Sequence, residues 1–261
     1  MKLAHQFAAI TNPPLRLPRV FAGSMLVAFL LMLAACETET LPEQPRYEQY
    51  FPLESGRVWE YQLDSILYRE TVPNDTQRWF IRQELGQEYT DLEGRPSFPV
   101  LTYRRRSAAD AWRYHQTGIA RIWQNRAEWV ENNLRSIKLV FPVQESSDWQ
   151  GHLFFSDLEN IPTVEACNNL AYLYDWTYAY QDLHLPTTLG ALSFDSTLTV
   201  NQIGEQNLIE YNAASERYAT GVGLVWRKFE HLTTQTICPE CPWAEKAECG
   251  YSVEQQLIRW E

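Results

Sequence analysis

The chain has 261 residues, with 33 acidic and 22 basic side chains, and a net charge of −11 at pH 7. This acidity argues against a nucleic-acid partner, because binding to a phosphate backbone calls for a basic patch. Its longest apolar run is shorter than the roughly 20 residues that a transmembrane helix needs.

Residues 1–35 have the pattern of an export signal. They contain no acidic residue, and Lys2, Arg16 and Arg19 precede an apolar run over residues 20–33 that only Gly and Ser interrupt. A basic segment followed by an apolar run of this length is typical of a signal peptide.

The segment Leu33-Ala34-Ala35-Cys36 closes that run and resembles the bacterial lipobox, in which an acylated cysteine follows two small residues. We expect cleavage between Ala35 and Cys36 and a lipid anchor, palmitate included, on Cys36. A secretory signal peptide with a chance cysteine after its cleavage site is the alternative.

Cleavage would leave 226 residues with a net charge of −14, a size that fits one domain or at most two. Residues 36–46 are predicted to be the lipidated cysteine and an acidic tether, and residues 47–261 a single β-rich domain. The residue after Cys36 is Glu37 rather than Asp, which fits sorting to the outer membrane by resemblance to other lipoproteins. Whether the domain faces the periplasm or the outside stays open.

Alternating apolar and polar residues predict strands along most of the mature chain. A period of two is typical of a half-buried strand, and the segments that show it or suit a strand are residues 58–67, 79–89, 98–103, 134–143, 194–201 and 251–260. Residues 205–218 are the one helix candidate, although Ile209 and Tyr211 also suit a strand. We therefore predict a mainly antiparallel sheet, open or nearly closed like a barrel, with a β-sandwich as the alternative.

Four motifs of the mature chain resemble a group of uncharacterised bacterial envelope lipoproteins. They are Phe51-Pro52-Leu53 with Gly56 and Trp59-Glu60-Tyr61, then Ile137-Lys138-Leu139-Val140-Phe141-Pro142, Trp149-Gln150-Gly151, and Tyr218-Ala219-Thr220-Gly221-Val222-Gly223-Leu224-Val225. The resemblance implies an envelope location and no activity. Gly221-Val222-Gly223 is a poor phosphate loop, because a third glycine and a following helix are missing.

Four cysteines follow Cys36, namely Cys167, Cys238, Cys241 and Cys249. In an oxidising compartment an even number favours two structural disulfides. We expect Cys249 to pair with Cys238 or Cys241, and Cys167 with the remaining one. A zinc site or a redox-active Cys-x-x-Cys pair are the alternatives.

The sequence offers no catalytic motif. The five histidines are scattered, and neither a metalloprotease helix motif nor a Gly-x-Ser-x-Gly elbow occurs. No catalytic residue, resident metal or cofactor is therefore expected, although one sequence does not show which side chains converge.

Aromatic side chains give the one functional indication, because all 10 Trp and all 14 Tyr follow Cys36. Most of them are expected in the sheet core. Five Trp residues from the less regular middle of the chain are candidates for a ligand platform: Trp112, Trp123, Trp129, Trp149 and Trp176. The sequence thus favours a non-catalytic, membrane-anchored lipoprotein that binds an apolar ligand, a glycan or an envelope partner. A lipid-anchored hydrolase and a purely structural subunit are the rival hypotheses.

Overall fold

The computed structural model describes residues 47–70, 73–155, 173 and 175–261, which fall in a compact unit spanning Pro45–Glu261. In chain order its elements are the 3-10 helix η1 (Glu48–Tyr50) and β1 (Val58–Tyr68), β2 (Asp75–Leu85), β3 (Tyr89–Thr90), β4 (Pro96–Arg105), β5 (Arg113–Trp123), β6 (Arg126–Glu131), β7 (Leu134–Val140), β8 (Asp148–Gln150), β9 (Thr177–Leu189), β10 (Leu192–Gln206), β11 (Glu210–Ala219), β12 (Gly223–Thr233), α2 (Trp243–Lys246) and β13 (Cys249–Trp260).

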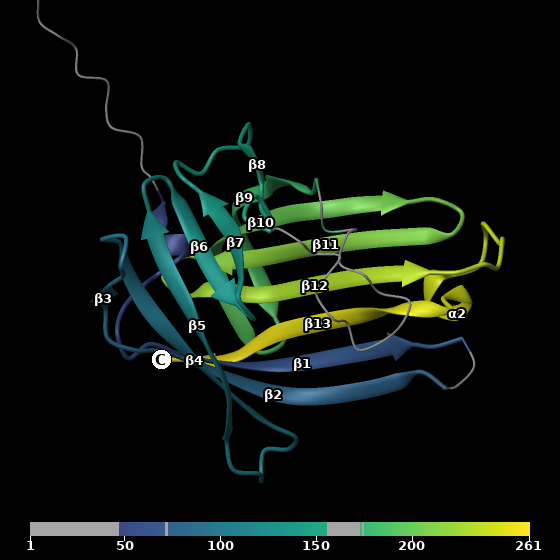
Figure 1. Cartoon of the computed structure of the whole chain (residues 1–261), viewed down its shortest axis with the longest axis horizontal. Helices are drawn as coiled ribbons and strands as arrows, with labels where there is room; N and C mark the ends of the chain where they lie inside the picture. Colours follow the sequence, from purple (N-terminus) through teal and green to yellow (C-terminus); the bar gives the residue numbers. More distant parts are fainter. Residues whose placement is uncertain (1–46, 71–72, 156–172, 174) are drawn as a thin grey trace, which may run out of the picture. The chain divides into compact units, whose positions relative to one another are not determined.

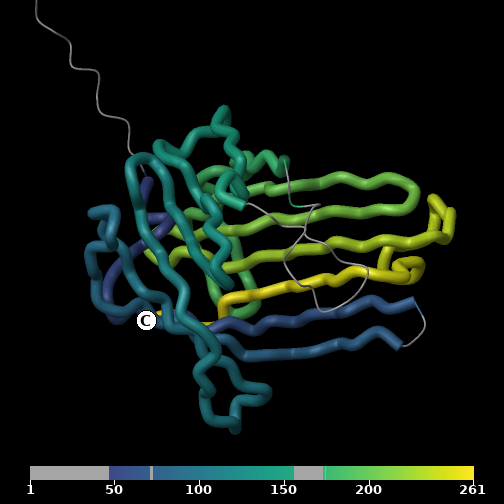
Figure 2. Tube along the Cα trace, in the orientation of Figure 1, coloured from purple at the N-terminus to yellow at the C-terminus, as the bar shows by residue number. Residues whose placement is uncertain are grey.

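These strands form one antiparallel sheet in the part of the chain that the structure describes. The strand order is β7-β6-β5-β4-β2-β1-β13-β12-β11-β10-β9-β8, and β3 pairs with β4 beside this path. Figure 1 shows β1, β2 and β10–β13 as long neighbouring strands, with β4–β7 turned across one end of them. The last strand closes back on the first, since Trp260 lies opposite Trp59 in the β1–β13 register, and Figure 2 shows the C-terminus beside the start of β1.

The two ends of the strand path meet, so the sheet is nearly closed. The Ile137 N–H of β7 donates to the Gly151 carbonyl just after β8 at 2.8 Å, and the Trp149 indole N–H donates to the Ile137 carbonyl at 3.0 Å. The Tyr180 hydroxyl of β9 accepts from the Val140 N–H at 2.9 Å and donates to the Val140 carbonyl at 2.7 Å. The predicted antiparallel, nearly closed barrel-like sheet is confirmed.

Inward-facing side chains from all parts of this path form one core. Tyr61, Val100, Leu139, Leu198 and Leu257, from five different strands, are each at most 2% exposed. Burial of apolar surface from strands far apart in sequence is what bends the sheet around a common interior.

Each predicted strand segment lies on or overlaps a strand, but β5, β6, β8, β9 and β12 were not predicted. In β9 the reason is local: Asp182 and His184 have positive φ angles of 51° and 60°, and the β9–β10 register shifts at this part of the pairing. Such bulges interrupt the alternation from which a strand is predicted.

Of the two interpretations left open for residues 205–218, the helix is wrong and the strand is confirmed, since β11 covers Glu210–Ala219. The Asn207 side-chain oxygen accepts from the N–H groups of Ile209 and Glu210, each at 2.9 Å, and this turn joins β10 to β11. Leu208, half exposed in that turn, does not form a helical stripe with the buried Tyr218. Asparagine favours turns because its side chain satisfies local backbone groups.

No helix among the described residues is long and apolar enough to cross a membrane.

The predicted pairing of Cys249 with Cys238 or Cys241 is also wrong. Cys238 and Cys241 form a disulfide with each other, and their Cα atoms are 5.4 Å apart. The cause is a tight turn in which the Cys241 N–H donates to the Cys238 carbonyl at 3.3 Å. This turn brings the two Cα atoms to a distance that a disulfide spans. Cys249, at the start of β13, is disulfide-bonded as well. Neither Cys238 nor Cys241 is left for Cys167, which lies outside the described residues.

Gly250 at the start of β13 provides a test of the pairing between β12 and β13. Its φ is +120°, and a Cβ atom there would overlap the His231 carbonyl of β12. We expect Gly250→Ala to lower the free energy of unfolding by about 1–3 kcal/mol, measured by urea denaturation. Gly204→Ala is the matched control, because nothing lies within 4 Å of a Cβ at that position. Equal midpoints for the two variants would contradict the β12–β13 geometry.

Candidate ligand pocket

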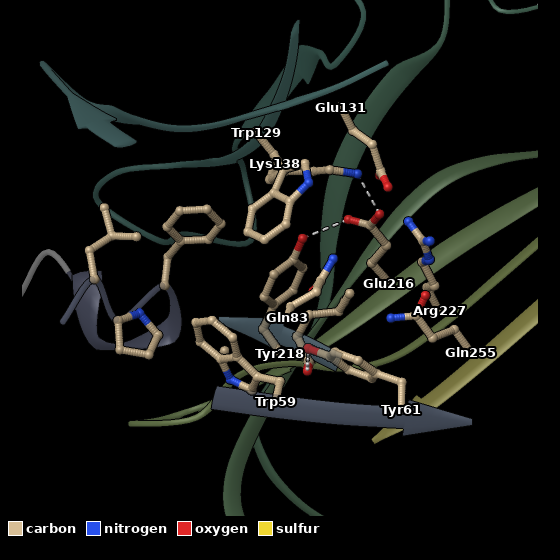
Figure 3. A pocket seen from close by; sticks show the side chains of 15 residues that line it. Trp59, Tyr61, Gln83, Trp129, Glu131, Lys138, Glu216, Tyr218, Arg227 and Gln255 are labelled. Carbon is tan, nitrogen blue, oxygen red and sulfur yellow. Dashed lines mark hydrogen bonds and ion pairs between the residues drawn. The ribbon is translucent and has the colours of Figure 1, made fainter. Parts of the chain in front are cut away.

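A pocket lies inside the sheet, beneath the segment Tyr47–Leu53, here called the strap. Phe51 and Leu53 of the strap line it together with inward-facing side chains of β1, β2, β6, β7 and β11–β13. Its open space is about 40 Å³, enough for roughly three water molecules. Figure 3 shows Trp59, Tyr218 and Trp129 around this space, beside a network centred on Glu216.

The strap is fixed to the sheet by hydrogen bonds. Tyr50 is fully buried, and its hydroxyl is hydrogen-bonded to the Ser196 hydroxyl at 2.7 Å and to the His184 Nδ1 at 2.8 Å. The Gly221 N–H donates to the Gln49 carbonyl at 2.8 Å. Phe51 then meets Trp129 edge to face, with ring centroids 6.2 Å apart, so the strap forms an apolar wall of the pocket.

The wall formed by β1 is held against the start of β12. The Trp59 indole N–H donates to the Val222 carbonyl at 2.6 Å, and the Tyr61 hydroxyl donates to the Leu224 carbonyl at 3.0 Å. These two aromatic side chains belong to the first of the four sequence motifs, and the carbonyls belong to the last. The motifs thus meet at the pocket, with Lys138 of the second motif opposite them.

Glu216 of β11 is the buried charge of the site. It is 3% exposed, and its two carboxylate oxygens accept from the Lys138 ammonium and from the Tyr218 hydroxyl, each at 2.6 Å. Lys138 lies on β7, far from β11 in the strand path, so this ion pair crosses the interior of the sheet.

Burial and charge act on Glu216 in opposite directions. Burial raises its pKa, but the Lys138 charge, the hydrogen bonds from Lys138 and Tyr218, and the Arg227 charge together hold the pKa below its ordinary value. Burial first, and then the Glu216 charge, raise the pKa of Tyr218 well above its ordinary value. Glu216 therefore stays ionised and Tyr218 stays a hydrogen-bond donor at neutral pH.

The five predicted platform residues are not brought together. Trp129 lines the pocket. Trp149, 9% exposed, packs on Tyr180 in the core, and Trp176, 3% exposed, stacks on Phe229 and borders a second, more polar hollow. Trp112 lies under the guanidinium of Arg105 at 4.0 Å, and Trp123 is the half-buried last residue of β5.

Sequence reasoning missed the polar side chains of the pocket. Lys138 lies within a quoted motif, but Gln83, Glu216, Arg227 and Gln255 were not singled out. Alternate residues of β11 are buried from Asn212 to Tyr218, so a strand assignment there would have placed Glu216 on the inner face. The choice between helix and strand was left open for this segment, so the inner face was not assigned.

The site shows no metal centre. Within the described ranges, no group of three or more His, Cys, Asp or Glu side chains is placed to hold a metal ion. The polar groups that line the pocket are amides, tyrosine hydroxyls, an indole N–H and charged side chains, all of which form hydrogen bonds.

No family model and no curated protein matches this chain. Two solved structures are similar to it in part: a candidate exported protein with a YmcC-like fold from Bacteroides fragilis, and a candidate lipoprotein from Parabacteroides distasonis. The first is 11% identical with a TM-score of 0.35, and the second 12% identical with a TM-score of 0.33; each match covers 81% of this chain and 98% of the other. At this level of similarity, the role of the chain has to be inferred from its own residues.

Proposed function

We propose that this chain is a lipid-anchored protein of the cell envelope whose β-domain binds a small ligand without transforming it. The observation behind the proposal is the pocket under the strap, which combines an aromatic wall with buried polar groups inside the sheet. Ligand sites are commonly concave, mostly apolar and equipped with a few fixed polar groups.

The envelope location is supported by the sequence of residues 1–36. The basic segment, the apolar run and Leu33-Ala34-Ala35-Cys36 agree with export and acylation of Cys36. The same residues, with Glu37 after the cysteine, favour anchoring in the outer membrane. Residues 1–46 lie outside the described part of the chain.

A binding role, rather than a hydrolytic one, is supported by the chemistry of the pocket. Among the described residues that line it there is no Ser, Cys or His, the side chains that usually act as nucleophile and base. Glu216 is held ionised by Lys138 and Tyr218, so it is a poor proton donor at neutral pH.

Native mass spectrometry of the protein purified from its own envelope tests the binding role. We expect a retained small molecule, recovered chemically unchanged, that is lost when Leu224→Trp fills the pocket. Leu208→Trp is the control, because Leu208 is 52% exposed in the β10–β11 turn and does not line the pocket. Retention by both variants, or release of a cleaved product, would contradict the proposal.

A further inference from the structure

Two buried glutamines of the pocket have no hydrogen-bond partner among the residues that the structure describes. Gln255 of β13 is 2% exposed and Gln83 of β2 is 6% exposed, and both line the pocket. Within the described residues neither side-chain amide forms a hydrogen bond, although buried polar groups nearly always find a partner. Figure 3 shows Gln83 beside Tyr218 and Gln255 beside Arg227, and both border the pocket, so a molecule bound there can supply the missing partners.

A third glutamine shows what is special about these two. The Gln202 amide nitrogen of β10 is sealed from solvent and has no hydrogen-bond partner in the described ranges, and Gln202 does not line the pocket. The amide atoms of Gln83 and Gln255 are not sealed in this way, because they border the open space. Each amide offers donors and an acceptor at once, which suits hydroxyl groups.

The charges that line the pocket cancel. Lys138 and Arg227 are balanced by Glu216 and Glu131. Arg227 lies opposite Glu216 in the β11–β12 register, yet it forms no ion pair within 4.0 Å among the described residues. Its guanidinium thus retains free N–H donors in a neutral surrounding. A ligand with a net charge would upset this balance, whereas a neutral ligand with several hydrogen-bonding groups would not.

Aromatic and apolar side chains line the same pocket, and Trp59 is the cross-strand neighbour of Gln83 in the β1–β2 register. Trp129 is half buried and meets Phe51 edge to face, and Trp59 has its indole N–H occupied by the Val222 carbonyl. A sugar ring has a matching pair of surfaces, an apolar C–H face that packs on an aromatic ring and an edge of hydroxyl groups.

We propose that the pocket takes one neutral sugar ring, with its hydroxyl edge on Gln83, Gln255 and Arg227 and its apolar face against Trp129. This inference rests on the proposed function and names the ligand class of the same site. The open space of about 40 Å³ suits the hydroxyl edge of one ring and no second sugar. The bound ring would therefore be the terminal sugar of a glycan, with the rest of the glycan outside the pocket.

Calorimetric titration of the full chain in nanodiscs tests the ligand class. The probes are neutral hexoses, N-acetylhexosamines and their short oligomers, compared with hexuronic acids, hexosamines and the apolar dye N-phenyl-1-naphthylamine. We expect binding of a neutral sugar, weakened about five- to tenfold by Gln83→Leu and by Gln255→Leu. Both variants should be at least as heat-stable as the wild type, because neither amide is paired with a residue in the described part of the chain. Gln202→Leu is the matched control and should bind like the wild type.

The other outcomes separate the two proposals. If the protein prefers a charged sugar, the neutral-sugar class is overturned and the ligand-binding role stands. The same holds if only the dye binds and the Leu224→Trp variant no longer binds it. If all three Gln→Leu variants bind the sugar with the same affinity, the assignment of Gln83 and Gln255 as sugar contacts would be overturned. Binding of no probe, together with no molecule retained from the envelope, would overturn both proposals.

Discussion

Lys138→Met is expected to destabilise the domain strongly, by about 3–5 kcal/mol, because it leaves a buried carboxylate without its cation. The Glu216 side chain is 4% exposed and the Lys138 side chain 16% exposed, with 2.6 Å between their charged atoms. The variant keeps only the Tyr218 hydroxyl as a direct partner of Glu216. Urea denaturation at pH 7 measures the loss.

Two further variants control for this effect. Lys228→Met removes an ammonium paired with Glu230 whose side chain is 41% exposed, and its cost should stay below about 1 kcal/mol. Adding Glu216→Gln to Lys138→Met should recover most of the loss, because the buried charge is then gone and the amide oxygen still accepts from Tyr218. Equal costs for Lys138→Met and Lys228→Met would show that the interior ion pair is not formed.

The pH dependence of this loss follows from the direction of the Glu216 pKa. In the wild type the folded-state pKa is lowered, so the stabilising contribution is present above the ordinary glutamate pKa and is lost as pH falls through the folded-state value. In Lys138→Met burial is no longer opposed by the ammonium, and protonation relieves the penalty. The stability difference between the two proteins should therefore shrink as pH falls from 7 toward 4.

Cys36→Ser is expected to move the protein from the membrane fraction to the soluble fraction. The lipobox-like segment Leu33 to Cys36 motivates this prediction, and several acyl chains on one residue exceed the two signals that stable anchoring requires. Fractionation with immunodetection measures the distribution, and mass spectrometry of the wild type should find an acylated N-terminal Cys36.

The double substitution Cys238→Ser with Cys241→Ser is the matched control. It removes the disulfide before α2 and leaves Cys36 intact, so the protein should stay in the membrane fraction. An unmodified Cys36, or cleavage at another residue, would refute the anchor.

The sequence by itself determined the antiparallel β architecture. Over residues 58–67 the alternation of apolar and polar side chains specifies both the strand and the face that enters the core, because strand side chains alternate between faces. It also motivated Trp129 as a ligand contact, although as one of five Trp residues, of which four lie away from the pocket under the strap.

Only the tertiary structure decided which polar residues meet. Lys138 and Glu216 are 78 positions apart, and their contact exists because closure of the sheet brings β7 opposite β11. The Asn207 turn decided between helix and strand in favour of a hairpin, and the tight turn at Cys238 joined Cys238 to Cys241. Local patterns fix strands and faces, but the partners across a closed sheet depend on how all twelve strands of the path curl around one interior.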